Sequence, residues 1–286
     1  MTTRPASPPV MSHPLIVFGI TGRMGQSLIA ALREGSPFEL YGAIASSASH
    51  RLGQECAAQG PPTGVVITAD AAAALKAAAG KPSAVAMDFS VGGAVAAHVQ
   101  ACAQAGVPVL VGATGFDAAA QAELERAAKK IAVLIAPNTS VGIAVLRDLV
   151  AQATQALGEA FDVEISEAHH RLKRDAPSGT ALKLGEAVAQ ARGECLSDVA
   201  VYERHDTDAP LKPGSIGFTV VRAGDIVGEH TVTFAGAGER LEFTHRAWDR
   251  MTFARGALRA AAWLLGRPAG LYGMQDVLRV QKKHGQ

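Results

Sequence analysis

The amino-acid sequence predicts an α/β fold, in which a doubly wound parallel sheet is followed by a second, α+β domain. In the first half of the chain, short apolar runs of strand length alternate with segments of helical periodicity. From about residue 161 onward, segments with a period of two are separated by glycine turns, which is typical of antiparallel strands. The 286 residues are 48% hydrophobic, so the chain is able to bury a substantial core.

The first half is expected to form parallel strands, because a helix separates most of the strand-length runs. The alanine-rich segment 71–79 is interpreted as an ordinary helix, since alanine is the strongest helix former. The expected strands are 15–20, 38–45, 85–89, 108–111 and 131–136, and the expected helices are 24–33, 71–79, 94–104 and 118–130.

The second half begins with a strand from residue 161 and a helix from about residue 181. Three further strands, 216–222, 227–234 and 240–245, are joined by glycine turns, which predicts antiparallel hairpins. A last helix, 251–265, is expected to pack back on the first domain. The predicted domains are residues 14–140 plus 250–286 and residues 141–249, after a flexible tail at 1–13 in which Met11 is an alternative start.

The composition argues against several classes of protein. A net charge of +1 disfavours a partner bound by bulk attraction, such as nucleic acid or a membrane surface. No segment reaches the roughly 18 apolar residues that a membrane span requires, and the start of the chain lacks the apolar core of a signal peptide. Three widely spaced cysteines and the adjacent His169 and His170 complete no disulfide frame or metal site. We therefore expect a cytoplasmic protein without a metal.

A glycine turn, Gly19-Ile-Thr-Gly-Arg-Met-Gly25, lies between the first strand and the first helix. Glycines there allow the backbone to approach a diphosphate, and the helix amino end supplies N–H groups, so the turn predicts a Rossmann-type dinucleotide site. Thr21 stands where the strict motif has its middle glycine, and a plain tight turn is the alternative interpretation. Two further turns follow predicted strands on the same rim of the sheet. The predicted dinucleotide-binding residues are Gly19, Ile20, Thr21, Gly22, Arg23 and Met24, then Gly112, Ala113 and Thr114, then Ala136, Pro137, Asn138 and Thr139.

The end of the second strand favours a phosphorylated cofactor. An acidic residue at this position normally holds the adenosine ribose, but segment 45–51 has none. Without a carboxylate to repel it, a 2′-phosphate is accepted, and Ser46, Ser47 or Arg51 can bond to it. The sequence therefore predicts NADPH, with NADH as the alternative.

A loop between the strand at 161 and the helix at 181 concentrates groups that bind anions. It contains His169, His170 and Lys173, and it ends in Ser178-Gly179-Thr180, at the expected start of the helix. The backbone N–H groups of that start favour a bound carboxylate. A solvated charged face is the alternative, as for any run of charges.

These segments resemble the dihydrodipicolinate reductase family, whose members are also called 4-hydroxy-tetrahydrodipicolinate reductases. The resemblance runs in order from about residue 14 to residue 280. The motifs that carry it are Gly22-Arg-Met-Gly25, Gly112-Ala-Thr-Gly-Phe116, Ala136-Pro-Asn138, Ser140-Val-Gly142, Glu167-Ala-His-His170, Lys173, Asp175-Ala-Pro-Ser-Gly-Thr180 and Arg222-Ala-Gly-Asp-Ile-Val-Gly-Glu-His230.

The resemblance implies reduction of a small cyclic dicarboxylate by NAD(P)H, in lysine and diaminopimelate biosynthesis, by a homotetramer built through the second domain. It implies an acid/base role for His169, proton donation by Lys173, and dicarboxylate binding by His170, Gly179 and Thr180, to which the helix start adds Ser178. This chain has Ser46 and Ser47 where members often have an acid and an arginine, and Thr139 where some have phenylalanine.

Reduction of an imine-conjugated ring also requires a proton, which a cationic side chain supplies as a general acid. His169 suits this task near neutral pH. Lys173 either donates a proton or contributes only its charge, and the sequence leaves both roles open. Two other functions also stay open, namely another two-domain Rossmann amino-acid dehydrogenase and a non-catalytic dinucleotide sensor.

Overall fold

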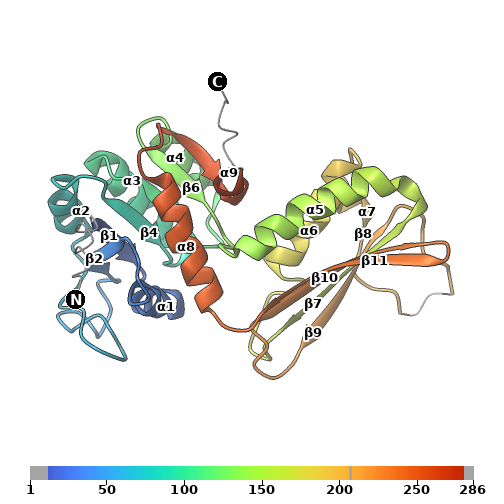
Figure 1. The fold of residues 1–286 in the computed structure, drawn as a ribbon, viewed down its shortest axis with the longest axis horizontal. Coiled ribbons are helices and arrows are strands. Elements are labelled where there is room, and N and C mark those ends of the chain that lie inside the picture. The colour runs from blue at the N-terminus through green and yellow to red at the C-terminus, as the bar shows by residue number, and fades with distance from the viewer. Residues whose placement is uncertain (1–11, 206–207, 280–286) are drawn as a thin grey trace, which may run out of the picture. The chain divides into compact units, whose positions relative to one another are not determined.

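The computed structural model describes residues 12–205 and 208–279, which fold into two compact units (Figure 1). The first contains residues 12–139 and 251–279, and the second contains residues 140–250. Most of the predicted tail, with Met11, lies outside the described residues, while His13 already belongs to a strand.

The first unit is built on a parallel sheet of seven strands in the order β12-β6-β5-β4-β1-β2-β3. The strand order reverses direction next to β1, which is the topology of a doubly wound sheet and confirms the predicted fold class. The strands are β1 (His13–Phe18), β2 (Phe38–Ile44), β3 (Ile67–Thr68), β4 (Val85–Asp88), β5 (Val109–Val111), β6 (Ala132–Ile135) and β12 (Gly270–Gly273). The short strands β3 and β12 were not predicted.

Helices cover both faces of this sheet. On one face, apolar side chains of α2, α3 and α4 form a core with alternate residues of the strands, such as Ile16 and Phe18. The helix α8 contacts α1 and the strands β4, β5 and β6, as predicted for a helix that returns to the first domain. The helices are α1 (Arg23–Leu32), α2 (Ala71–Ala79), α3 (Val95–Ala105), α4 (Ala118–Ala127), α8 (Met251–Leu264) and α9 (Met274–Leu278), with a 3-10 turn, η1 (Gly92–Ala94).

The second unit contains a mixed sheet of five strands in the order β11-β10-β7-β9-β8. Its strands are β7 (Asp162–His169), β8 (Ala200–Val201), β9 (Ile216–Arg222), β10 (Gly228–Gly236) and β11 (Glu239–Ala247). The helices α5 (Val141–Leu157) and α6 (Gly179–Ala191) share an apolar core with the sheet, and η2 (Gly158–Ala160) and α7 (Leu196–Val199) complete the unit. This α+β domain agrees with the predicted class.

One predicted hairpin is wrong. Strands β10 and β11 are antiparallel neighbours as expected, but β9 pairs in parallel with β7, which separates it from β10. The connection from β9 to β10 crosses the carboxyl end of β7 instead of turning back. There the N–H of Ala223 donates to the His169 carbonyl at 3.0 Å, and the N–H of Arg171 donates to the Gly224 carbonyl at 3.2 Å.

The helix α5 was also missed. Its apolar residues Ile143, Leu146 and Val150 recur at helical spacing and are buried in the second core. The hydroxyl of Ser140 caps its amino end by accepting from the N–H of Ile143 at 3.3 Å. Within the described ranges, no helix is both long enough and apolar enough to cross a membrane.

Candidate active site

The glycine turn of the first unit forms a cradle that larger residues would fill. Gly19 has a φ of +76°, in the left-handed region, and a Cβ on it would lie 2.6 Å from the carbonyl oxygen of Phe89. A Cβ on Gly25 would lie 2.5 Å from the Cα of Ile20, so this glycine permits close contact between α1 and the turn. Gly22 is the N-cap of α1, and no side chain caps the first N–H groups of the helix.

The residues of this turn differ in their exposure to solvent. Ile20 is fully buried, so only its backbone is available to a ligand, whereas Thr21, Gly22 and Arg23 are exposed and Met24 is half-buried. The amide of Gln26 donates to the Ile20 carbonyl at 2.8 Å and fixes the turn from behind. An exposed turn with uncapped helical N–H groups fits the diphosphate of a dinucleotide.

The two other predicted turns lie at the carboxyl ends of the neighbouring strands β5 and β6. The N–H groups of Gly112 and Ala113 donate to the Asp88 carbonyl at 2.8 and 3.0 Å, which leaves Thr114 exposed beyond them. In the turn after β6, Ala136 is buried, Pro137 is exposed and Asn138 is half-buried. The Thr139 side chain is buried and donates to the Phe253 carbonyl at 2.7 Å, so it anchors the chain within the first unit.

The end of β2 presents two exposed hydroxyls. Ser46 and Ser47 both face solvent, and the Ser46 carbonyl accepts from the N–H of Ser49 at 2.9 Å, which closes a tight turn. Arg51 points back into its own loop, where its guanidinium donates to the carbonyls of Glu55 and Cys56 at 2.8 and 3.3 Å. Of the three predicted 2′-phosphate ligands, the two serines are therefore the better candidates.

The buried carboxylate of Glu167 organises the candidate site of the second unit. It lies on β7, where Arg222 from β9 makes two hydrogen bonds to it, at 2.8 and 2.7 Å. It also accepts from the N–H of Ser178 at 2.9 Å and bonds to Nδ1 of His169 at 2.6 Å. Burial works to raise the pKa of Glu167, but these bonds outweigh it and hold the pKa below its ordinary value.

This carboxylate sets the orientation of His169. An ionised Glu167 requires a proton on Nδ1, so Nε2 is the imidazole atom left to exchange a proton with a ligand. A Cβ on Gly228 would lie 3.1 Å from this Nε2, so the glycine keeps space beside it. Burial lowers the pKa of His169, and the bond and charge of Glu167 raise it part of the way back.

A second histidine, His230, lies edge-on to His169, with ring centroids 5.2 Å apart. Its Nε2 is 3.0 Å from the Ser178 hydroxyl, and its buried Nδ1 has no hydrogen-bond partner among the described residues. Burial, assisted by the neighbouring His169, lowers the pKa of His230 to about 3. His230 is therefore neutral in the folded protein at ordinary pH.

This neutral histidine predicts a loss of stability in mild acid. Below about pH 6.5 the unfolded chain takes up a proton at His230 that the folded protein refuses until about pH 3, so stability falls as the pH falls through this window. At pH 5 the expected contribution is a loss of about 2 kcal/mol relative to pH 7.5. Urea unfolding at the two pH values measures the loss, and histidine NMR should show no titration of the folded His230 between them. A resonance of His230 that titrates in this range contradicts the expectation.

The two predicted side-chain ligands of the loop differ in their contacts. Lys173 donates to both carboxylate oxygens of Asp175, at 2.8 and 2.9 Å. Burial works to raise the pKa of Asp175, but Lys173 outweighs it and the net shift is downward. His170 follows β7 and is half-buried, and its carbonyl accepts from the N–H of Lys173 at 3.0 Å. The lysine pairing favours the second of its two proposed roles, a positive charge at the site.

The helix α6 begins beside this loop. Gly179 is exposed, and a Cβ added to it would meet no atom within 4 Å, while Thr180 is half-buried. Ser178 is buried, its N–H is used by Glu167, and its hydroxyl accepts from the N–H of Ala181 at 3.2 Å. The predicted carboxylate site thus retains Gly179 and Thr180, whereas Ser178 caps and positions the helix.

Three residues of this cluster were not predicted as members of the site. Glu167 continues the buried phase of β7, set by Val163 and Ile165, and a carboxylate in that phase was a signal in the sequence. Arg222 and His230 belong to a family motif, but no role in the site was predicted for them. The contact of Arg222 with Glu167 depends on the parallel pairing of β7 with β9, and that of His230 with Ser178 depends on the antiparallel pairing of β10 with β7. The predicted hairpin contained neither pairing.

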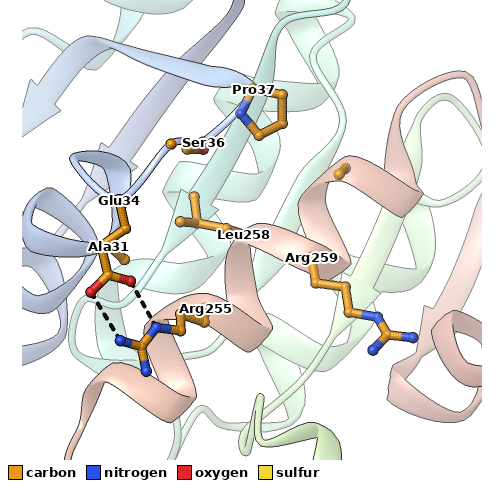
Figure 2. Close-up of a pocket in the computed structure, with 9 residues that line it drawn as sticks. Ala31, Glu34, Ser36, Pro37, Arg255, Leu258 and Arg259 are labelled. Carbon is orange, nitrogen blue, oxygen red and sulfur yellow. Dashed lines mark hydrogen bonds and ion pairs between the residues drawn. The ribbon is translucent and has the colours of Figure 1, made fainter.

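A separate pocket of the first unit encloses about 240 Å³ and is lined by Glu34, Leu258 and Arg259, among others (Figure 2). Arg255 closes one side of it with two bonds to Glu34, at 2.8 and 2.9 Å. The pocket lies where α1 ends and β2 begins, at the edge of the sheet opposite the glycine turn. It is therefore not the dinucleotide site. Within the described ranges, no group of three His, Cys, Asp or Glu side chains is placed to hold a metal ion.

Comparisons with known proteins identify the family of the chain. Residues 13–139 match the family model "Dihydrodipicolinate reductase, N-terminus", and residues 142–278 match "Dihydrodipicolinate reductase, C-terminus". The chain is 48% identical over 269 residues to the 4-hydroxy-tetrahydrodipicolinate reductase of Thiobacillus denitrificans, covering 94% of this chain and 99% of that protein. It is 46% identical over 266 residues to that of Anaeromyxobacter dehalogenans strain 2CP-1, covering 92% and 97%.

Solved structures share the fold. A dipicolinate-bound dihydrodipicolinate reductase from Paenisporosarcina sp. TG-14 has a TM-score of 0.72 at 23% identity and covers 94% of this chain and all of that one. An amine dehydrogenase from Mycobacterium smegmatis has a TM-score of 0.58 at 15% identity, covering 92% of this chain and 95% of that one. The two family models match nearly the whole chain, and the relatives are matched at almost full length. The chain belongs to the dihydrodipicolinate reductase family, as its sequence motifs predicted.

Proposed function

We propose that the protein reduces 4-hydroxy-tetrahydrodipicolinate to tetrahydrodipicolinate with a nicotinamide dinucleotide, in lysine and diaminopimelate biosynthesis. The first unit binds the dinucleotide, and the second binds the cyclic dicarboxylate. The observation that carries the proposal is the loop after β7, where His169 is held by Glu167 next to Lys173 and the exposed start of α6. Another amino-acid dehydrogenase or a non-catalytic sensor would not account for a proton donor, a lysine and an exposed helix start in one loop.

The dinucleotide would be held by the glycine cradle Gly19 to Gly25, by the turns after β5 and β6, and by the hydroxyls of Ser46 and Ser47. In the overall reaction the ring hydroxyl group leaves as water, and the bound reduced nicotinamide would supply the hydride that the resulting unsaturated ring accepts. The chain's own task is then to bind the ring and to provide a proton where negative charge develops. His169 delivers that proton from Nε2, while Glu167 fixes the ring and stabilises its cationic form.

Arg222 completes this arrangement from behind. Its two hydrogen bonds fix the position of the Glu167 carboxylate, which in turn fixes the orientation of the His169 ring. His230 stays neutral beside it and bonds through Nε2 to the Ser178 hydroxyl at 3.0 Å. The proton donor is thereby preorganised before substrate binds.

The two carboxylates of the substrate would be met by different groups. One accepts from the backbone N–H groups at the start of α6, Gly179 and Thr180, where the helix dipole favours an anion. The other pairs with Lys173 and His170. Lys173 already binds a carboxylate, that of Asp175, so we infer that a substrate carboxylate replaces Asp175 on it. Lys173→Ala is expected to raise KM and to lower kcat.

The test is to generate the substrate in place from pyruvate and aspartate semialdehyde, with the synthase that condenses them, and to follow the oxidation of NADPH and NADH separately. Oxidation that depends on both precursors supports the proposal. Oxidation with aspartate or another amino acid derivative instead would favour an amino-acid dehydrogenase. Dinucleotide binding without any turnover would favour a sensor.

We propose NADPH as the preferred cofactor, because the end of β2 carries exposed hydroxyls and no carboxylate. Ser46→Asp is expected to lower kcat/KM for NADPH at least about fivefold by repulsion of the 2′-phosphate, as for two like charges about 4 Å apart in water. The value for NADH should stay within about twofold. Steady-state kinetics with both cofactors measure the ratio, with Ser49→Asp in the same turn as the control. Equal losses with the two cofactors would contradict this assignment.

We also propose that the protein is a homotetramer assembled through the second unit. The edge strand β11 is exposed along most of its length, and Val221 and Leu241 expose 46% and 41% of their surface. Light scattering of the purified protein should give four times the mass of the 29.5 kDa chain.

A further inference from the structure

A buried carboxylate of the first unit, Asp88, takes no part in the proposed reaction. It is the last residue of β4 and is fully buried. One of its oxygens accepts from the N–H of Ser90 at 2.8 Å, and the other is 2.9 Å from Nδ1 of His98 on α3. The His98 ring in turn stacks on Phe18, with centroids 4.2 Å apart and planes inclined by 23°.

Ser90, His98 and Asp88 are the residue types of a hydrolytic triad, but their geometry does not fit one. The Ser90 hydroxyl and the Asp88 carboxylate both approach the same imidazole atom, Nδ1, at 3.3 and 2.9 Å. A relay requires the two partners on opposite ring nitrogens. Burial of a carboxylate is also costly, so its position calls for another explanation.

Its position in the sheet offers one. Strand β4 lies between β1, which leads into the glycine turn, and β5, which leads into the turn at Gly112. The strand order reverses beside β1, and ligands of open α/β sheets bind at that point of the carboxyl edge. The residues after Asp88 thus separate two of the three turns assigned to the dinucleotide.

The contacts of this segment are close on both sides. A Cβ on Gly19 would lie 2.6 Å from the Phe89 carbonyl oxygen and 2.8 Å from the Ser90 nitrogen. A Cβ on Gly112 would overlap the Phe89 ring, and one on Gly92 would overlap the Gly115 carbonyl. The backbone adds three bonds, because the Asp88 carbonyl accepts from Gly112 and Ala113 and the Phe89 N–H donates to the Phe18 carbonyl at 3.1 Å. Residues 89–92 are therefore a spacer packed between two glycine turns.

We propose that the Asp88–His98 pair positions residues 89–92, and through them sets the separation of the Gly19 and Gly112 turns that the dinucleotide requires. The inference rests on the proposed dinucleotide site. Asp88 and His98 are positioning residues, since neither needs to touch the cofactor. The bond to Ser90 fixes the start of the spacer, and His98 fixes the carboxylate from α3. The pair lies away from Ser46 and Ser47, at the end of β2, so it does not act on the 2′-phosphate. Binding of NADPH and binding of NADH should therefore depend on this separation to the same extent.

Two substitutions of His98 separate the hydrogen bond from the ring stacking. His98→Phe keeps a ring against Phe18 and removes the donor to Asp88, whereas His98→Asn keeps a donor at the place of Nδ1 and removes the ring. His13→Phe is the matched control, because His13 lies against Phe38 at the opposite end of the same strand, β1. Should His98→Phe fail to fold, His98→Ala compared with His98→Asn gives the same contrast.

The measurements are dissociation constants by calorimetry for NADPH, NADH and pyridine-2,6-dicarboxylate, with hydrogen exchange of peptides 89–92 and 112–115 in the unliganded protein. We expect His98→Phe to weaken both dinucleotides at least about fivefold and by similar factors, with faster exchange in both peptides. The dicarboxylate should bind as in the wild type, and His98→Asn and His13→Phe should stay within about twofold of it.

Several outcomes would overturn the inference. One is unchanged dinucleotide affinity in His98→Phe despite faster exchange or a lower melting temperature, because the pair would then serve stability alone. Another is an equal loss in His98→Phe and His98→Asn, because the donor that asparagine keeps would then not preserve binding, and the hydrogen bond to Asp88 would not be what positions the segment. A wild-type protein that binds neither dinucleotide would instead refute the proposed function itself, together with the basis of this inference.

Discussion

His169→Gln is expected to lower kcat by about 10²–10⁴-fold, which is the usual contribution of a positioned general acid. Glutamine fills a similar space and keeps an amide for Glu167, so the buried network is disturbed little. It cannot deliver a proton at the position of Nε2. The KM for the dicarboxylate should change by less than about threefold, because the proposed carboxylate ligands are at Lys173 and the start of α6.

The dependence of kcat on pH gives this prediction a second readout. Burial lowers the pKa of His169, so its cationic form is lost as the pH rises through a value below 6.5, and kcat should fall with it. This limb should disappear in His169→Gln. In Glu167→Gln it should move to lower pH, since Glu167 raises the pKa of His169. His205→Gln, at an exposed position, is the control. A full rate and an unchanged limb in His169→Gln would refute its acid role.

Arg222→Met is expected to cost about 3–5 kcal/mol of unfolding free energy, as for removal of one partner of a buried ion pair. The Glu167 side chain is 1% exposed and would lose both bonds of its guanidinium partner. Methionine fills much of the volume, so the loss reflects the carboxylate more than a cavity. The variant should also lose its bond to the Asp175 carbonyl, which connects β9 to the loop after β7.

Urea unfolding at pH 7.5 measures this change. Lys183→Met is the matched control, because Lys183 pairs with Glu186 on the surface of α6 with 60% and 37% of their side chains exposed. Such pairs contribute little, and we expect a change below about 1 kcal/mol there. Equal effects of the two substitutions would show that the Glu167 pair adds no more than a surface pair. The double variant Arg222→Met/Glu167→Gln should recover part of the loss, because no buried charge is left unpaired.

Local sequence patterns were sufficient for most elements of the first unit. Its strands are short apolar runs with helices between them, and Ala71–Ala79 has the bounds that its composition predicts. The predicted turns at Gly19, Gly112 and Ala136 follow β1, β5 and β6, and they lie on one edge of the sheet because these strands run parallel. Strand β3 was missed because it has only two residues, and β12 was missed because glycine, which is unfavourable in strands, stands at both of its ends.

In the second unit, local sequence patterns did not predict which strands pair with each other. Strands β9 and β10 are separated by a glycine turn, yet they do not pair with each other. Strand β9 pairs with β7, whose carboxyl end lies more than fifty residues earlier in the chain. For the same reason the contacts of Arg222 and His230 were not foreseen, while His169, Lys173 and the start of α6, which are close in sequence, were named. The burial of Asp88 likewise depends on neighbours from β1, α3 and β5, and its sequence context alone gives no charge partner.

The crossing of β7 by the connection from β9 to β10 bears on how this chain tolerates change. Surface turns are usually where insertions, deletions and new chain ends are accepted most readily. Here Ala223 and Gly224 are bonded to His169 and Arg171, so a length change in this turn acts directly on the residues proposed for catalysis. The hairpin turn between β10 and β11 has no such contacts with that loop, since it joins the opposite ends of the strands. Tags, fused domains or permuted ends belong in the turn at residues 236–239, and the turn at residues 223–227 should keep its length.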